Sequence, residues 1–223
     1  RKSTIAVARA VAPLARAGPR PCTRPGDTPG TPVFYDRVFL AIVAPEGRGG
    51  AVGDCDNKGK HMDTLIPRAA EIGEMLKARK ETIGIAESST GGLISAALLA
   101  QPGASAYYLG GAVVYTRQAR SALTSITDDD MRQVRSASEP YAAKLAKQAR
   151  ERLGATWGLA ETGATGPTGN RYGDPAGHSC IAISGPIDAV ITLRTGSSDR
   201  QANMRAFAAR AFELLAETLA KKG

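Results

Sequence analysis

The sequence at residues 81–92 is Glu81-Thr82-Ile83-Gly84-Ile85-Ala86-Glu87-Ser88-Ser89-Thr90-Gly91-Gly92, and an Ala- and Leu-rich run to Gln101 follows it. The apolar first half, with its β-branched residues, predicts a buried strand, and the run after residue 92 predicts a helix. The turn between them places hydroxyl groups and glycines beside the unpaired N–H groups of the helix start, where an anion or a developing oxyanion is stabilised. The same turn is also typical of a plain helix cap, because Ser and Thr are favoured N-cap residues.

The rest of residues 62–223 alternates predicted helices and strands. An amphipathic helix is predicted over 64–80, and a second helix begins at Ser138 as N-cap and ends at Gly154. The predicted strands cover residues 112–115, 156–160, 179–184 and 189–193, with the last two joined as a hairpin. Ser198 and Gln201 fit a capping box that opens the C-terminal helix. This order predicts an α/β fold, with a mainly parallel sheet covered by helices on both faces.

Three loops of this fold carry polar side chains. Ligands of such sheets bind beyond the carboxyl ends of the strands, so the loops after Ala86, Tyr115 and Glu161 meet there if their strands run parallel. The third loop is glycine-rich from Gly163 to Gly169 and resembles a phosphate cradle. It lacks the Lys-Ser/Thr ending of a P-loop, so a plain surface loop is the alternative.

Residues 1–61 differ in composition from the rest of the chain. They are rich in Arg, Ala and Pro, and their ten Lys and Arg against five Asp and Glu account for most of the net charge of +8. This composition resembles an organellar transit segment, but it also fits a disordered segment or upstream sequence included by a wrong start. We place a domain boundary at Met62, between a poorly structured basic extension and a domain over 62–223. One strand-like run, residues 38–43, lies within the extension. The expected location is cytoplasmic, or organellar if the extension is a transit segment.

Several function classes are not indicated. No apolar run approaches the roughly 20 residues of a membrane span. Cys22, Cys55 and Cys180 are far apart and lack a Cys-x-x-Cys spacing, so neither a disulfide framework, a metal site nor another cofactor is expected. His178 borders an apolar run, which favours a structural role. Residues 62–223 hold 19 basic and 16 acidic side chains and few aromatics, so no nucleic-acid partner is expected.

Ser88 is the candidate nucleophile of this sequence. It needs a group that removes its proton and donors that hold the oxyanion, and the N–H groups of Thr90, Gly91 and Gly92 could supply the donors. A base is harder to find, because the sequence after Tyr115 offers arginines rather than a neutral Lys or His.

The polar side chains near Ser88 allow more than one role. Arg117 and Arg120 stay protonated and are poor bases, but they suit bidentate binding of a phosphate or carboxylate. Tyr115 could relay a proton or simply pack against the protein. Glu87 follows an apolar strand, so it is expected to be buried with a partner such as an Arg or backbone donors.

Several motifs, in register, resemble the C-terminal domain family of the competence/damage-inducible protein CinA. The resemblance covers the chain from about Thr64 to its C-terminus. The matching segments are Glu87-Ser88-Ser89-Thr90-Gly91-Gly92, Pro102-Gly103-Ala104-Ser105-Ala106-Tyr107-Tyr108, Gly110-Gly111-Ala112-Val113-Val114-Tyr115, Ser138-Glu139-Pro140, Glu151-Arg152-Leu153-Gly154-Ala155 and Gly163-Ala164-Thr165-Gly166-Pro167.

The resemblance implies an activity and a set of site residues. Stand-alone members are nicotinamide-nucleotide amidohydrolases of pyridine-nucleotide salvage, which convert nicotinamide mononucleotide and water to nicotinic acid mononucleotide and ammonia. The implied fold is a three-layer α/β/α sandwich with a mixed, mostly parallel sheet, and members often self-associate into homo-oligomers. The implied catalytic positions are Ser88 as nucleophile, Thr90 in the same turn, Tyr115 and Arg120. The implied substrate-binding positions are Glu87, Ser89, Gly91, Gly92, Gly163, Thr165 and Gly166.

Two departures from the family pattern leave alternatives open. The family has Ser-Asn-Glu-Ala-Lys after the tyrosine, and Arg120 stands here at the position of the lysine that partners the nucleophile. The family loop ends Lys-Pro-Val-Gly, whereas this chain has Asp174-Pro175-Ala176-Gly177. The chain could therefore be a nicotinamide mononucleotide deamidase, a domain that binds a nucleotide or phosphorylated ligand without chemistry, or an amidase with another substrate.

Overall fold

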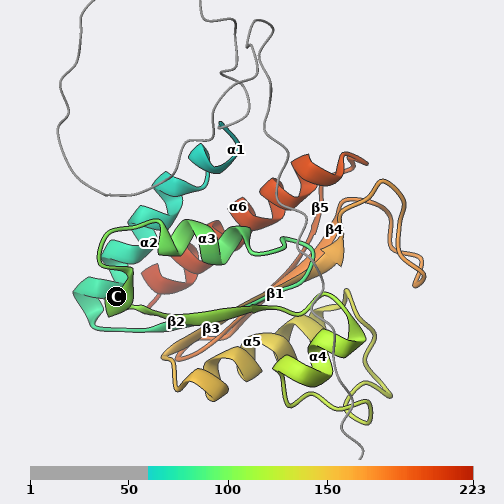
Figure 1. The fold of residues 1–223 in the computed structure, drawn as a ribbon, viewed down its shortest axis with the longest axis horizontal. Helices are drawn as coiled ribbons and strands as arrows, with labels where there is room; N and C mark the ends of the chain where they lie inside the picture. The colour runs from blue at the N-terminus through green and yellow to red at the C-terminus, as the bar shows by residue number, and fades with distance from the viewer. Residues whose placement is uncertain (1–59, 223) are drawn as a thin grey trace, which may run out of the picture. The chain divides into compact units, whose positions relative to one another are not determined.

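The computed structural model describes residues 60–222, with side chains from residue 62 onward (Figure 1). Residues 1–59 of the predicted extension, with its strand-like run and two of the three cysteines, lie outside the described residues. Within the described part of the chain, no helix is long and apolar enough to cross a membrane.

The described residues form one five-stranded sheet in the order β2-β1-β3-β4-β5. β1 pairs in parallel with both β2 and β3, whereas β4 is antiparallel to its neighbours β3 and β5. Four strands therefore share one direction, and the mixed sheet predicted from the sequence is confirmed. The parallel strands β1, β2 and β3 bring the three polar loops to one edge. The strands are β1 (Ile83–Glu87), β2 (Tyr108–Val113), β3 (Trp157–Ala164), β4 (His178–Ser184) and β5 (Ala189–Arg194).

Helices cover both faces of the sheet and complete the three layers (Figure 1). One face carries α2 (Ile66–Arg79), α3 (Leu93–Leu99) and α6 (Arg200–Ala220), which pack against one another. The other face carries α5 (Glu139–Leu153), with α4 (Arg117–Leu123) beside it. The short helix α1 (Lys60–Asp63) precedes α2, and a 3₁₀ turn spans Ala104–Ala106.

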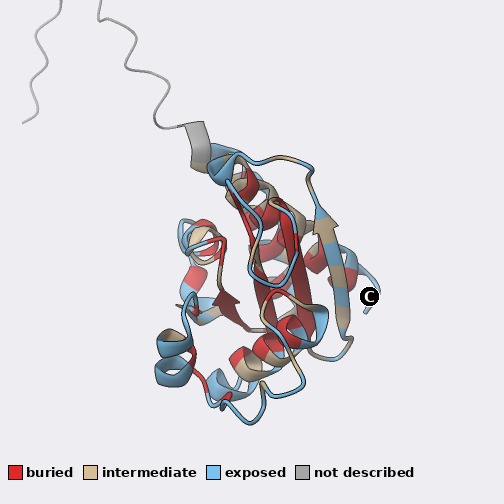
Figure 2. Ribbon diagram, turned by 90° about the vertical axis from the view of Figure 1, so that its right-hand side faces the viewer, coloured by how far each residue is buried: buried red, intermediate tan, exposed pale blue. Residues whose placement is uncertain are grey.

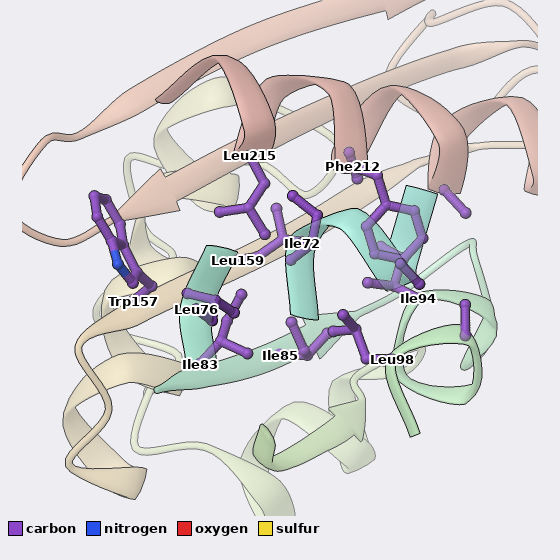
Figure 3. Packing of buried hydrophobic residues seen from close by; sticks show 14 of the residues in the cluster. Ile72, Leu76, Ile83, Ile85, Ile94, Leu98, Trp157, Leu159, Phe212 and Leu215 are labelled. Carbon is purple, nitrogen blue, oxygen red and sulfur yellow. The ribbon is translucent and has the colours of Figure 1, made fainter. Parts of the chain in front are cut away.

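The larger apolar cluster lies between the sheet and the α2, α3 and α6 layer. Ile83, Ile85 and Leu159 project from the strands into it and meet side chains of all three helices (Figure 3). Each such fully buried aliphatic side chain stabilises the fold by about 1.5–3 kcal/mol. Figure 2 shows the three central strands buried along their length, while β2 and β5 alternate partly buried with exposed positions.

Two strands differ in extent from their predictions. β2 spans Tyr108–Val113, so it begins and ends earlier than the strand predicted over residues 112–115. Its glycine pair, Gly110-Gly111, gave no strand signal in the sequence, but close packing leaves no room for a side chain at Gly111. A Cβ on Gly111 would lie 2.5 Å from the Ser95 hydroxyl. β3 extends to Ala164, because its pairing with β4 continues up to His178, and so it includes residues 161–164 that were predicted as loop.

Two helix details also correct the sequence interpretation. The N-cap of α6 is Asp199, which accepts a hydrogen bond from Ala202 N at 3.0 Å, so the predicted Ser198 capping box is wrong. The helix over 138–154 is confirmed as α5, and the apolar spacing of Tyr141, Leu145 and Leu153 predicts one buried face. Tyr141 and Leu145 are buried, whereas Leu153, at the last turn, is 39% exposed.

Candidate active site

The carboxylate of Glu87 accepts hydrogen bonds from the N–H groups at the start of helix α3. Its Oε2 accepts hydrogen bonds from Gly92 N at 2.9 Å and Ile94 N at 3.1 Å. Its Oε1 accepts from Ser95 N at 2.8 Å and from the Ser95 hydroxyl at 2.6 Å. Glu87 is fully buried, as its place after an apolar strand predicts, and its partners are backbone donors and a hydroxyl. The anion that the sequence predicts at this helix start is therefore a side chain of the protein itself.

A second buried carboxylate, Glu161 of β3, holds the turn from the neighbouring strand. Its Oε2 accepts from Ser88 N at 3.3 Å, from Thr90 N at 2.9 Å and from the Thr90 hydroxyl at 3.1 Å. Its Oε1 accepts from the hydroxyls of Ser89 at 2.5 Å and Ser179 at 3.0 Å. Burial raises the pKa of Glu161, although the hydrogen bonds from these residues act in the opposite direction.

These two carboxylates correct the predicted oxyanion hole. Of the three N–H groups expected to hold an oxyanion, those of Thr90 and Gly92 are bonded to Glu161 and Glu87. Within the described residues, Gly91 is the one of the three whose N–H has no acceptor in the protein.

Ser88 lies on the pocket side of this turn. A cavity of about 190 Å³ collects residues from the loops after β1 and β2, from β3 and from α5. Ser88, Tyr115 and Arg120, three of the predicted catalytic residues, are brought together in its wall. The other lining residues are Val114, Thr116, Arg117, Ser136, Tyr141, Thr162 and Arg171.

Arg120 contributes a buried positive charge to the pocket. Its residue surface is 7% exposed, and its Nη2 pairs with Asp128. Within the described part of the chain, its Nε is a buried donor with no partner. Arg117 also pairs with Asp128, so both arginines of the Arg117–Arg120 segment share one carboxylate. Since a guanidinium stays protonated, this arrangement supplies charge and donors but no base.

The Tyr115 hydroxyl is hydrogen-bonded to Arg200, a residue of α6 that does not line the pocket. The Tyr115 residue is 58% exposed, and its hydroxyl accepts a hydrogen bond from Arg200 Nη2 at 3.3 Å. Arg200 Nη1 donates to the carbonyl of Gly166 at 2.9 Å. The first residue of α6 therefore connects the predicted proton-relay tyrosine to the glycine-rich loop.

The remaining predicted residues do not line this pocket. The side chains of Glu87, Ser89, Thr90 and Thr165 are buried and do not line the pocket. The first three form hydrogen bonds within the protein: Ser89 and Thr90 with Glu161, and Glu87 with Ser95. The glycines predicted to bind substrate are not part of the pocket wall either; they are Gly91, Gly92, Gly163 and Gly166.

Sequence reasoning missed several groups of this site, among them Arg171 and Ser136 of the pocket wall. Glu161 carries the same signal as Glu87, an acidic residue after an apolar strand, but the sequence prediction assigns it to a loop. Thr162 and Tyr141 lie on predicted elements without a motif that marks them, and Arg200 lies just past the incorrectly placed helix cap.

Asp174, at the loop position where the resemblance implies Lys, is hydrogen-bonded to other side chains of the protein. It pairs with Arg135 through both of its oxygens and accepts from Asn170 Nδ2 at 2.8 Å. Burial acts to raise the pKa of Asp174, but the hydrogen bonds from Arg135 and Asn170 outweigh it and lower the pKa. His178 is buried nearby, with Nε2 2.9 Å from the carbonyl of Ala137, in keeping with a structural role. Among the described residues, no group of three or more His, Cys, Asp and Glu could hold a metal ion.

These features define a three-layer α/β/α domain with a serine-bearing strand–turn–helix and an arginine-lined pocket at the carboxyl edge of its parallel strands. The chain belongs to the CinA C-terminal domain family, whose model matches residues 66–219.

Curated relatives carry the same family name. A CinA-like protein of Prochlorococcus marinus is 41% identical over 118 residues, which cover 53% of this chain and 28% of that protein. A CinA-like protein of Desulfosudis oleivorans is 38% identical over 159 residues, covering 70% of this chain and 38% of that protein. The chain therefore spans less than two fifths of the length of these relatives.

Solved structures of shorter proteins match more completely. A competence-damaged protein (CinA) superfamily protein from Escherichia coli is 28% identical, with a TM-score of 0.66, over 70% of this chain and 90% of the other. A CinA superfamily protein from Klebsiella pneumoniae is 26% identical, with a TM-score of 0.67, over 70% of this chain and 98% of the other. The α/β fold of this chain is thus that of the CinA superfamily.

Proposed function

We propose that this chain is an amidohydrolase that deamidates nicotinamide mononucleotide, releasing nicotinic acid mononucleotide and ammonia. The observation that carries the proposal is that Ser88, Tyr115 and Arg120 share one pocket at the carboxyl edge of the parallel strands. Membership of the CinA family supports the same reaction, through the resemblance described above.

In the proposed mechanism, the Ser88 hydroxyl oxygen attacks the carboxamide carbon and forms a tetrahedral intermediate. The serine proton passes by way of Tyr115 to the departing nitrogen, which leaves as ammonia. Water then cleaves the acyl-enzyme, giving the carboxylate and restoring the serine hydroxyl. The N–H groups of Thr90 and Gly92 are bonded to carboxylates and Gly91 is not part of the pocket wall, so the positive charge of Arg120 is the group proposed to stabilise the oxyanion.

The charge of the pocket suits a phosphorylated substrate. Arg117, Arg120 and Arg171 all contribute to its wall, and Arg117 and Arg120 share the carboxylate of Asp128. Guanidinium groups bind phosphate oxygens through paired N–H donors. The proposal assigns the substrate phosphate to Arg117 and Arg171 and leaves Arg120 to the oxyanion.

A second candidate is a binding domain without chemistry. Arg120 at the lysine position favours it, and so does the commitment of two predicted oxyanion donors to buried carboxylates. A third candidate, deamidation of another phosphorylated carboxamide, is compatible with the loop in which Asp174 replaces the family lysine.

The test is ammonia release from nicotinamide mononucleotide by the purified 223-residue chain, with Ser88→Ala as the inactive variant and Ser89→Ala as the matched control. We expect activity that falls at least about a thousandfold in Ser88→Ala. Ser89→Ala should keep most of the activity, because the Ser89 hydroxyl donates to the buried Glu161 and does not line the pocket. Thermal stabilisation by the nucleotide without ammonia release would favour the binding domain instead.

A further inference from the structure

Glu161 is connected to three consecutive residues of the turn that carries Ser88. Ser88, Ser89 and Thr90 all donate to it, and four of its five hydrogen bonds come from this turn. The fifth comes from Ser179 on the adjacent strand β4. Glu161 itself is fully buried and does not line the pocket. It therefore contacts the backbone of the proposed nucleophile without reaching the space where a substrate would lie.

The donors are divided unequally between the two oxygens. Oε2 receives both backbone N–H groups, from Ser88 and Thr90, together with the Thr90 hydroxyl. Oε1 receives hydroxyls alone, from Ser89 and Ser179. A hydroxyl can rotate to accept a hydrogen bond, whereas a backbone N–H can only donate. A glutamine could thus place its oxygen at Oε2 and direct its NH₂ toward the two hydroxyls, which would then accept.

Glu87, the other buried carboxylate, offers no such substitution. Each of its oxygens faces at least one backbone N–H, from Gly92 and Ile94 on one side and from Ser95 on the other. An amide NH₂ at either place would meet a donor. The two carboxylates are therefore distinguishable by experiment.

We propose that Glu161 is a positioning residue for Ser88. Its Oε2 fixes the N–H groups on both sides of Ser89 and thereby sets the backbone from which the Ser88 hydroxyl enters the pocket. Geometry, not charge, is the contribution of this side chain. The inference rests on the proposed function only in taking Ser88 as the nucleophile, and it holds for any substrate that Ser88 attacks.

The experiment compares Glu161→Gln, Glu161→Asp and Glu161→Ala in the full chain. Gln keeps the acceptor at Oε2 and removes the charge, whereas Asp keeps the charge and withdraws the acceptor by one methylene. Two readouts are measured: kcat and KM for deamidation, and the rate at which a fluorophosphonate probe modifies Ser88, followed by mass spectrometry of the Ser88 peptide. Ser179→Ala is the matched control, because it removes a hydrogen bond to Glu161 from outside the turn.

We expect Glu161→Gln and Ser179→Ala to keep kcat and the Ser88 labelling rate within about fivefold of wild type. Glu161→Asp and Glu161→Ala should lower both by roughly 10- to 100-fold while KM changes little, because displacement of a reacting group by about 1 Å costs up to about 100-fold in rate. Circular dichroism and thermal melting check the fold of each variant. If Glu161→Ala fails to fold, the comparison of Asp with Gln carries the test.

The proposal is overturned if Glu161→Asp matches wild type while Glu161→Gln is inactive, since charge would then be the contribution. It is also overturned if Ser88 of the wild-type chain does not react with the probe. A wild-type chain that labels at Ser88 but releases no ammonia from nicotinamide mononucleotide contradicts the proposed function alone. In that case, slower labelling of the Asp and Ala variants still supports the role of Glu161.

Discussion

Thr90 donates both its backbone N–H and its hydroxyl to one oxygen of Glu161, at 2.9 Å and 3.1 Å. This pair turns Thr90 away from the pocket, although its place in the motif predicts a catalytic position. We expect Thr90→Val, which keeps the side-chain shape, to destabilise the fold by about 1–3 kcal/mol, because the buried carboxylate of Glu161 loses a hydroxyl donor. Thr90→Ser should restore most of that loss. Urea unfolding of the two variants and wild type measures both effects, and equal stability of Thr90→Val and wild type would contradict this account of the pair.

Tyr115 and Arg200 supply the second prediction. Because Tyr115 is 58% exposed, Tyr115→Phe should leave the free energy of unfolding within about 0.5 kcal/mol of wild type. If the hydroxyl relays the serine proton, the same change lowers kcat by roughly 100-fold with little change in KM. Arg200→Gln, which releases the tyrosine hydroxyl and the carbonyl of Gly166, should lower kcat less. A Tyr115→Phe enzyme with full kcat would remove Tyr115 from the mechanism.

Arg120 allows a test of the base that the family pattern places here. We expect Arg120→Lys alone to change deamidation little, because Asp128 would pair with the new ammonium and keep it protonated. The double variant Arg120→Lys with Asp128→Asn should release a neutral lysine at lower pH and raise kcat by at least about tenfold over Arg120→Lys. Ammonia release across the range of about pH 7–9 measures the difference. No gain in the double variant would favour a binding pocket over an active site that lacks only its base.

The sequence predicts the fold more fully than the site. Ile83, Ile85 and Leu159 carry local signals, apolar and β-branched, that depend little on partners distant in sequence, and the structure places them in the core. The convergence of Ser88 and Tyr115 follows from parallel strands alone.

The parts that the sequence could not show depend on pairing across the sheet. Glu161 belongs to no local motif, and its partners lie 71 to 73 residues before it and 18 after it. Its role appears only when β1, β3 and β4 are adjacent. For the same reason, sequence reasoning assigns the N–H groups of Thr90 and Gly92 to a ligand, whereas their acceptors are carboxylates of the chain itself.

Stability should depend on pH through Glu161. Burial raises the pKa of Glu161 above its ordinary value near 4.5, so the folded chain holds this proton at pH values where the unfolded chain has lost it. The stability that this group contributes is therefore largest at low pH and declines as pH rises from about 4.5 through the raised pKa. Residue 161 cannot titrate in Glu161→Gln. We therefore expect the free energy of unfolding of this variant to increase relative to that of wild type as pH rises over this range. Urea unfolding of both proteins at intervals of pH tests the sign, and a trend in which Glu161→Gln instead loses stability relative to wild type as pH rises would contradict it.

Asp174 should show the opposite dependence. The hydrogen bonds from Arg135 and Asn170 lower the pKa of Asp174 despite its burial, so its contribution is complete above the ordinary pKa of an aspartate and is lost as pH falls through the lowered value. We expect Asp174→Asn to destabilise the chain by about 1–2 kcal/mol at neutral pH, a loss moderated because the Arg135 side chain is 42% exposed. The difference from wild type should shrink as the pH is lowered below the ordinary aspartate value. Asp129→Asn is the control, because its ion pair with Arg132 joins side chains that are 77% and 76% exposed, and water screens such a pair. If the two asparagine variants lose equal stability at neutral pH, the buried position of Asp174 contributes nothing, and its replacement of the family lysine would have to be explained by contact with substrate.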